Sequence, residues 1–402
     1  MPLNLSNIAL GISPSATLAM DTKAKELIAA GYDVIKFGVG EPDFDTPAFI
    51  RDAGKNAIDA GKTRYTAVAG TVELRREIAK KFLKDNGLTY DPIGQIIVSS
   101  GAKPVIYTAL CALINPGDEV IIPSPCWVSY PEMVRMAGGV PVFAPTSAEN
   151  GFVYTADDIR PYVTEKTKAI IINSPSNPNG CILSRDILQG LADLAVEKEF
   201  YVISDEIYEK LIYDGEEHVS IASLGDKIKE QTIVINGVSK TYAMTGWRIG
   251  YAAGPRNIIK LMTSFQSHAA SNPNSVAQEA ATVALAAGDA PCVQEMVDEF
   301  DERRKLMHAM VNEIPGLSGI LPKGAFYQMV NIRAIIGKKY NDRVITGSES
   351  FAEILLDSKY VAVVAGKSFG DDNHLRLSYA TSQQNIRNGM ARIAEFISEL
   401  TD

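Results

Sequence analysis

Continuous apolar runs of strand length recur through the middle of the chain, each followed by a polar turn and a helical segment. The expected strands are 95–99, 119–123, 139–143, 168–172, 200–204, 231–236 and 248–253. Because most of these runs are apolar throughout rather than alternating, both faces of the strands are expected to be covered by helices. The pattern therefore predicts an α/β fold with a mostly parallel, seven-stranded sheet.

The flanking regions have longer helical periodicity and fewer strands. Before the sheet, helices are expected over 17–30, 47–60 and 71–86; after it, helices near 292–313, 348–358 and 383–399 alternate with strands near 325–330, 361–364 and 374–379. This indicates a second, smaller α+β domain. The predicted division is an arm (1–12), the first part of the small domain (13–46), the large domain (47–288) and the rest of the small domain (289–402).

Composition excludes several classes of protein. The 402 residues are 46% hydrophobic and carry a formal charge of −9 without a basic run, so neither nucleic acid nor a membrane is an expected partner. The start lacks the pattern of a secretory signal, and the four cysteines are scattered as reduced thiols usually are. The four histidines form no ligand pattern. We expect a cytoplasmic protein without a structural metal.

Candidate chemistry lies just after the expected strands, because open parallel sheets bind ligands outside the carboxyl ends of their strands. Gly101, Ala102 and Lys103 form a turn into a helix, whose free N–H groups are suited to a phosphate, although many such turns bind nothing. Trp127 follows the next strand and could stack on a flat ring or serve as a core anchor.

Three further strand ends carry an amide, an acid and an amine. Asn177 lies in a Pro- and Asn-rich loop, which could be a simple turn or could place a hydrogen-bond donor. Asp205 ends an apolar strand, either as a helix N-cap or as a buried acid that needs a cation such as a protonated pyridine nitrogen. Lys240, with Arg248 nearby, is either a surface lysine or an amine whose lowered pKa suits a Schiff base. Together these groups match the needs of pyridoxal phosphate.

Five motifs carry a resemblance to a known family. The segments are GEPDF (40–44), SPSNPNG (174–180), SDEIYE (204–209), SKTYAMTGWRIGY (239–251) and HLRLSYA (374–380). In this order they resemble the class I aminotransferases of the fold-type I superfamily, which depend on pyridoxal 5'-phosphate. The resemblance runs from about residue 13 to the C-terminus. It is nearest to the bacterial branch that contains aspartate, prephenate and aromatic aminotransferases.

The resemblance implies a role for each matching residue. The cofactor would be bound by Gly101, Ala102, Lys103, Trp127, Asn177, Asp205, Tyr208, Ser239, Lys240, Arg248 and, from the partner subunit of a homodimer, Tyr65. The implied catalytic residues are Lys240, which forms the Schiff base and then acts as general base, Asp205, which pairs with the pyridine nitrogen, and Tyr208, which joins Asn177 at the phenolic oxygen.

One position departs from the family pattern. Many relatives have a hydroxyl residue three positions before the lysine, where this chain has Gly237, so Ser239 is expected to supply the hydroxyl at the phosphate. The resemblance also implies cis peptide bonds before Pro125 and Pro178.

Substrate binding is implied at a further set of positions. Arg376 would bind the α-carboxylate as a bidentate pair and Gly40 would close over it, next to Trp127 and Asn177. Lys103, Ser15 and Thr17 match the bacterial pattern for an acidic side chain. The expected reaction is ping-pong transamination of aspartate with 2-oxoglutarate.

Other functions remain as alternatives. A prephenate or aromatic aminotransferase shares the same catalytic residues, and a β-lyase on the same fold is the more distant choice. A pyridoxal phosphate-sensing transcription regulator would need a DNA-binding segment for which residues 1–12 offer no room. A nicotinamide dehydrogenase is disfavoured because the GVG at 38–40 lacks the third glycine of a dinucleotide-binding turn.

Overall fold

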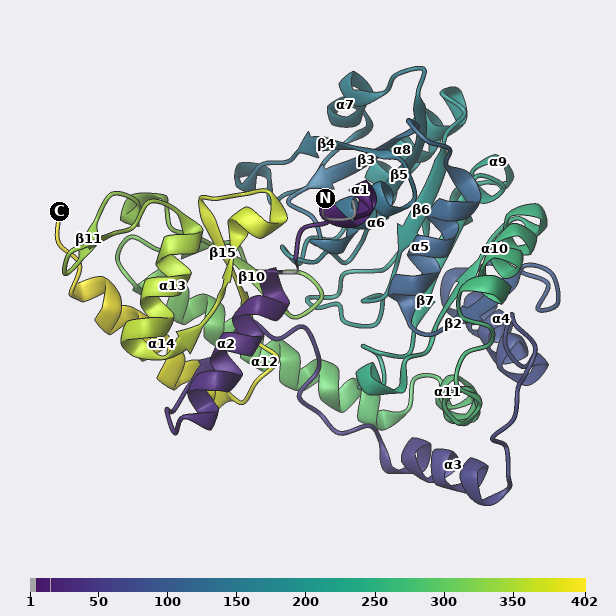
Figure 1. Cartoon of the computed structure of the whole chain (residues 1–402), viewed down its shortest axis with the longest axis horizontal. Helices are drawn as coiled ribbons and strands as arrows, with labels where there is room; N and C mark the ends of the chain where they lie inside the picture. The colour runs from purple at the N-terminus through teal and green to yellow at the C-terminus, as the bar shows by residue number, and fades with distance from the viewer. Residues whose placement is uncertain (1–4, 15) are drawn as a thin grey trace.

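The computed structural model describes residues 5–14 and 16–402, and its centre is one seven-stranded sheet (Figure 1). The strands are β2 (Ile96–Ser99), β3 (Glu119–Ser124), β4 (Val140–Pro145), β5 (Thr167–Asn173), β6 (Tyr201–Asp205), β7 (Thr232–Gly237) and β8 (Gly250–Ala253). They lie in the order β2-β8-β7-β6-β5-β3-β4, and only β8 runs antiparallel to its neighbours. The prediction of a mostly parallel, seven-stranded sheet is confirmed.

Helices cover both faces of this sheet, as the unbroken apolar strands predict. One face packs against α5 (Ala102–Leu113), α6 (Ser129–Met136) and α10 (Arg256–Ala269), and the other against α4 (Val72–Asn86), α8 (Arg185–Glu197) and α11 (Ser275–Ala287). Neighbouring residues enter opposite cores: Ile122 packs with α5 and α6, while Ile121 packs with α8. Period-two geometry therefore requires apolar side chains at every position of these strands.

The smaller domain combines long helices with short, mainly antiparallel strands. Its helices are α2 (Ala16–Ala29), α12 (Pro291–Glu313), α13 (Ser348–Lys359) and α14 (Gln383–Ser398). Its strands are β1 (Ile35–Lys36), β9 (Ser318–Gly319), β10 (Tyr327–Asn331), β13 (Val361–Ala362), β14 (Val364–Ala365) and β15 (His374–Ser378). The parallel pair β1–β13 joins the N-terminal segment to the C-terminal part of the chain.

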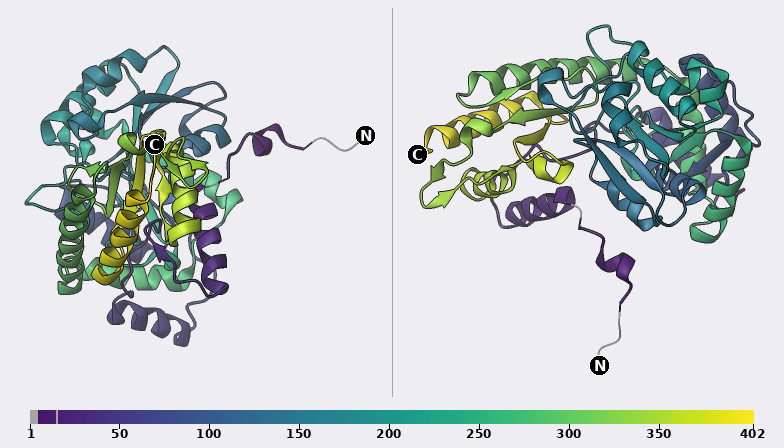
Figure 2. Two further views of the ribbon diagram at one scale, coloured as in Figure 1. Left: turned by 90° about the vertical axis from the view of Figure 1, so that its left-hand side faces the viewer. Right: turned by 90° about the horizontal axis from the view of Figure 1, so that it is seen from above.

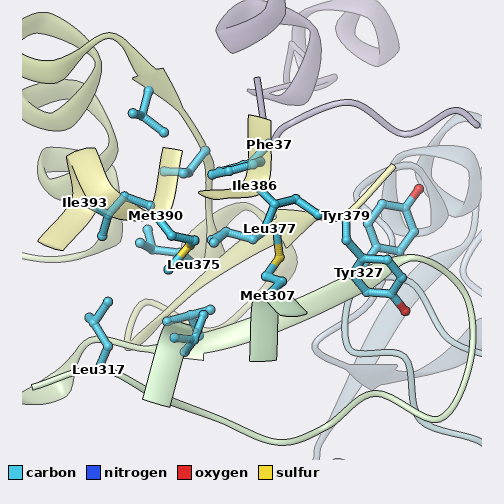
Figure 3. Close-up of a cluster of buried hydrophobic side chains, with 14 of the residues drawn as sticks. Phe37, Met307, Leu317, Tyr327, Leu375, Leu377, Tyr379, Ile386, Met390 and Ile393 are labelled. Atoms are coloured by element: carbon cyan, nitrogen blue, oxygen red, sulfur yellow. The ribbon is translucent and has the colours of Figure 1, made fainter. Parts of the chain in front are cut away.

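One continuous core fills this smaller domain. Figure 3 shows Phe37, Leu375 and Leu377 packed among side chains of α12 and α14, with the hydroxyl groups of Tyr327 and Tyr379 at its edge. The two-domain α/β architecture is therefore as expected. The exact domain bounds stay a prediction, and the strand expected over 361–364 is two short strands interrupted at Val363.

The remaining elements lie at the periphery. They are α1 (Asn7–Leu10), α3 (Ala48–Asp59), α7 (Ala156–Ile159), α9 (Asp226–Lys229), β11 (Lys339–Tyr340) and β12 (Arg343–Val344), with short 3₁₀ turns between the larger elements. The segment that carries α1 extends from the body of the molecule (Figure 2). Across the described ranges, none of the helices combines the length and apolar character that crossing a membrane would require.

Candidate active site

A cleft of ≈ 500 Å³ opens at the carboxyl ends of the central strands and is also lined by residues of the smaller domain. The predicted site residues that line it are Gly40, Ala102, Lys103, Trp127, Asn177, Asp205, Tyr208, Ser239, Lys240, Arg248 and Arg376. These positions span more than 300 residues of sequence, yet the topology of the sheet brings them to one place. The strand-end rule therefore located the cleft correctly.

Asp205 is the last residue of β6 and is only 4% exposed. Its Oδ2 accepts a 2.6 Å hydrogen bond from the hydroxyl of Tyr130, and its Oδ1 accepts a 3.2 Å bond from the N–H of Ile207. Burial raises the pKa of this carboxyl to about 6, although both hydrogen bonds lower it. A buried acid held by neutral donors is suited to binding a cationic group, such as a protonated ring nitrogen.

Lys240 lies in the turn between β7 and β8, where its Nζ donates a 2.5 Å hydrogen bond to the carbonyl oxygen of Gly40. The ammonium also stands over the rings of Tyr208 and Phe326, at 5.7 and 5.5 Å from their centroids. Burial, together with the charges of Arg248 and Arg376, lowers the pKa of Lys240 to about 8, although the charge of Glu41 raises it. The amine therefore loses its proton more readily than a surface lysine, as a nucleophile must.

The first turn of α5 has the features that suit an anion. No side chain caps this helix, and its N-cap residue, Gly101, has φ of +105°, which favours glycine. A Cβ atom at Gly101 would lie 2.8 Å from Cζ of Arg248, so the missing side chain leaves room for the guanidinium. Free N–H groups, the helix dipole and one arginine suit a phosphate group.

Gly237 has a packing reason that the sequence did not reveal. It is the last residue of β7 and pairs with Gly250 of β8. A Cβ atom there would lie 3.0 Å from the carbonyl oxygen of Ile249 and 3.1 Å from Cα of Gly250. Ser239 is buried and lines the cleft, so a hydroxyl group is present beside Lys240.

Arg376 of β15 also lines the cleft and is 2% exposed. Its Nη1 donates to Oδ1 of Asn177 at 3.0 Å, and its Nη2 donates to the carbonyl oxygen of Gly38 at 2.8 Å. Its Nε is buried without a hydrogen-bond partner among the described residues, and burial lowers the pKa of the guanidinium. A buried arginine with an open donor fits a carboxylate ligand.

Sequence reasoning missed two tyrosines of the cleft. Tyr130 lies in α6, three positions after Trp127 in the preceding loop, and their rings meet edge to face at 5.3 Å. Tyr327 belongs to β10 of the smaller domain, and its hydroxyl lies 2.9 Å from that of Tyr208. Spacing could have identified Tyr130, but no local signal marks Tyr327.

Lys103 lines the cleft, whereas Tyr65 lies outside it. Lys103 is exposed, with its Nζ 4.8 Å from the centroid of the Trp127 ring, and partial burial together with the charge of Arg248 lowers its pKa. Tyr65 is 92% exposed and does not line the cleft. Ser15 lies outside the described residues, and of Thr17 only the backbone, in α2, is described.

Among the described residues, three X-Pro peptide bonds are cis. Those before Pro125 and Pro178 were predicted, and the one before Pro175 was not. All three lie in the loops after β3 and β5, which carry Trp127 and Asn177.

The donor set fits pyridoxal phosphate: a buried acid, an amine with a lowered pKa, and a phosphate-binding helix start surround one cleft. The fold and the site thus define a pyridoxal phosphate-dependent enzyme of the two-domain α/β type. A family model described as aminotransferase class I and II matches residues 32–393. The chain belongs to this family and is a pyridoxal phosphate-dependent aminotransferase.

Several relatives match along almost their whole length. The aspartate aminotransferase of Bacillus subtilis (strain 168) is 46% identical, over 99% of this chain and 100% of its own. An aspartate/prephenate aminotransferase of Cereibacter sphaeroides is 45% identical over 99% of both chains. Among solved structures, the Rhizobium meliloti aspartate aminotransferase superposes with a TM-score of 0.95 at 39% identity, covering 100% of both chains. The Thermus thermophilus aspartate aminotransferase with maleate gives 0.92 at 42% identity, covering 98% of this chain and 100% of its own.

Proposed function

We propose that this aminotransferase transfers the amino group of aspartate to 2-oxoglutarate by a ping-pong mechanism, yielding oxaloacetate and glutamate. The observation that carries the proposal is the set of groups that line one cleft: Asp205, Lys240 and Arg376, whose buried Nε has no hydrogen-bond partner among the described residues. An amino acid bound there would present its α-carboxylate to the guanidinium and its amine toward Lys240. The names of the relatives above support aspartate as the substrate.

Lys240 is proposed to have two roles. Its unprotonated Nζ would hold the cofactor, and the same nitrogen would take the proton from Cα of the bound amino acid. A pKa of about 8 lets a useful fraction of the amine be unprotonated near neutral pH. When bound, pyridoxal phosphate supplies an aldehyde for amine exchange and a ring that accepts the electrons released at Cα.

The neighbouring residues are proposed to hold these groups in place. Asp205 would keep the ring nitrogen protonated, because its buried carboxylate forms no ion pair with a side chain of the described residues. The hydroxyl of Tyr208 and the amide of Asn177 would bind the phenolic oxygen, and Trp127 would stack on the ring. Gly101, Ala102, Ser239 and Arg248 would hold the phosphate.

Substrate recognition is proposed to use charge at both ends of the amino acid. Arg376 would bind the α-carboxylate through two parallel hydrogen bonds, with Gly40 closing the backbone over it. Lys103, held over Trp127, is the proposed partner of the distal carboxylate, with the hydroxyl groups of Ser15 and Thr17. A second candidate is prephenate, which the names of several relatives pair with aspartate. A β-lyase is a weaker alternative.

A homodimer in the cytoplasm is the proposed form. Tyr65 is 92% exposed on one chain, and the apolar side chains Leu5, Ile8 and Leu10 are exposed on the extending N-terminal segment. Covering such surface with a second copy would remove apolar area from water. Tyr65 would then reach the phosphate of the partner subunit's cofactor.

A panel of half-reactions tests the proposal. The purified holoenzyme is mixed with single amino acids, and the shift of the cofactor absorption band is followed at each concentration. Aspartate and glutamate should convert the band with the highest kcat/KM, whereas a preference for aromatic amino acids or arogenate would favour the second candidate. Borohydride treatment followed by peptide mapping should attach the cofactor to Lys240; attachment elsewhere would contradict the proposed roles.

A further inference from the structure

The turn that follows β6 has two acids on its outer side. Asp205 and Tyr208 line the cleft, whereas Glu206 and Glu209 are buried, at 2% and 4% exposure, and do not line it. The main chain holds the turn through the N–H of Glu206, which donates to the carbonyl of Ile235 at 2.9 Å. The side chains of a five-residue segment thus divide between the cofactor site and a polar cluster behind it.

Glu206 is held by three donors from two segments of chain. Its Oε1 accepts hydrogen bonds from the hydroxyl groups of Ser204, at 3.0 Å, and Ser220, at 2.6 Å. Its Oε2 lies 3.0 Å from Nε2 of His218, which donates to the carboxylate in the tautomer that carries the proton on Nε2. Glu206 therefore ties the turn to the loop around residues 218–220.

Glu209 ties the same turn to α4. Its Oε1 pairs with the ammonium group of Lys81, and its Oε2 accepts a 3.0 Å hydrogen bond from Nδ2 of Asn86, the last residue of that helix. Lys81 also donates to Oδ1 of Asn86 at 2.7 Å. Burial disfavours the charged acid, but the charges of Lys81 and His218 outweigh it and lower the pKa of Glu209.

The geometry of Glu206, Glu209 and His218 alone would also suit a metal ion, since their ligand atoms lie within 4.8 Å of one another. The charges argue otherwise. Every oxygen of the two carboxylates already accepts a donor, and the buried ammonium of Lys81 occupies the place of a cation. A divalent ion would have to displace Lys81 and meet its charge at close range.

We propose that Glu206 and Glu209 are positioning residues for the cofactor: by anchoring the outer side of residues 205–209, they fix where Asp205 and Tyr208 stand in the cleft. Neither acid touches the cofactor or the substrate. The segment is only five residues long, so the backbone cannot shift on the side of the two glutamates without also moving the side chains that face the cleft. The inference rests on the proposed roles of Asp205 and Tyr208.

The test compares Glu206→Ala, Glu206→Gln and a destabilised control, Ile393→Ala, which removes a buried side chain from α14 in the smaller domain. Each protein is measured for the unfolding temperature of the apoprotein, the Kd for pyridoxal phosphate, and kcat and KM for aspartate. We expect Glu206→Ala to weaken cofactor binding about tenfold or more and to lower kcat, with KM little changed because Arg376 is not disturbed. Glu206→Gln keeps an acceptor for Ser204 and Ser220, so it should retain most of the wild-type cofactor affinity and most of the wild-type kcat.

The control separates positioning from general stability. Ile393→Ala should lower the unfolding temperature of the apoprotein while leaving cofactor affinity near that of the wild type. If Glu206→Ala and Ile393→Ala weaken cofactor binding equally at matched loss of stability, the proposal is wrong. Ser220→Ala, which removes a single hydrogen bond, offers the same comparison should Glu206→Ala not fold.

A metal arm completes the test. When the apoprotein is titrated with Zn²⁺, we expect no stoichiometric binding at this cluster. Stoichiometric binding by the wild type that is lost in Glu206→Gln would instead assign the cluster to a metal ion. The proposed function fails differently, because the wild type would then not attach pyridoxal phosphate at Lys240. Normal attachment in the wild type, with unaltered affinity in Glu206→Ala, overturns only the positioning role.

Discussion

The hydroxyl of Tyr130 donates a 2.6 Å hydrogen bond to Oδ2 of Asp205. Burial raises the pKa of Tyr130, so the phenol stays protonated and remains a donor. It is therefore the side chain that stabilises the ionised form of the buried acid most directly, before a cofactor cation is bound. Tyr130 of α6 and Asp205 of β6, 75 positions apart in the sequence, together set the charge at this part of the cleft.

Tyr130→Phe should raise the pKa of Asp205 above about 6, because the ionised carboxylate loses a hydrogen bond. A carboxyl whose pKa is raised by folding contributes stability below its unfolded pKa, and that contribution is lost as the pH rises through the folded pKa. The difference in the free energy of unfolding between wild-type and variant apoproteins should thus grow by about 1 kcal/mol between about pH 4 and about pH 8. Urea denaturation at several pH values measures it.

The control for this prediction removes the titrating group. In an Asp205→Asn background, Tyr130→Phe should cost the same free energy at every pH, since no carboxyl remains to titrate. A difference that is independent of pH in the presence of Asp205 would show that the hydrogen bond does not act on the carboxyl's ionisation.

Lys240 should control how fast the apoprotein takes up its cofactor. The rate of appearance of the bound cofactor band should rise with pH around a midpoint of about 8, where the amine loses its proton. Glu41→Gln should move this midpoint lower, because the charge of Glu41 raises the pKa of Lys240. Stopped-flow mixing across a pH series checks both; Glu77→Gln, on the exposed ion pair with Lys80, is the control and should leave the midpoint unchanged.

Gly101→Ala should impair cofactor binding out of proportion to its effect on stability. Gly117 provides the matched variant, because its φ is +90° and a Cβ atom there would meet no atom within 4 Å. Both substitutions strain the backbone, and each should cost about 1 kcal/mol or more of stability. Only Gly101→Ala places a methyl group against Arg248, so only it should raise the Kd for pyridoxal phosphate, by about tenfold or more. If Gly101→Ala and Gly117→Ala had equal Kd values for pyridoxal phosphate, Gly101 would not be part of the phosphate site.

Lys103→Ala should raise the KM for aspartate far more than the KM for phenylalanine, because only aspartate carries a distal carboxylate. The fold-increase in KM for aspartate should be about ten times the fold-increase for phenylalanine. Steady-state kinetics with both amino acids measures the ratio, and Lys168→Ala, at a lysine over the Tyr201 ring, serves as the control. Similar increases in KM for both substrates would mean that Lys103 does not bind the distal carboxylate.

The sequence by itself determined the class of fold and most of the cleft. The strands can be recognised from the sequence as unbroken apolar runs because each strand is buried on both faces, as Ile121 and Ile122 illustrate. The polar residues that end these runs are then necessarily neighbours, since parallel strands bring their carboxyl ends to one edge. That is why Asp205 and Lys240 could be placed together without coordinates.

Only the tertiary structure decided what surrounds these groups. Tyr327 reaches Tyr208 from a different sheet, Gly237 is glycine because β7 and β8 approach closely there, and Lys81 meets Glu209 across more than 120 residues of chain. Such contacts leave no periodic trace in a sequence, because they depend on which surfaces of separate elements are pressed together. Local patterns record what a residue's own strand or helix requires; the partners of a buried charge are set by packing between elements that are distant in the chain.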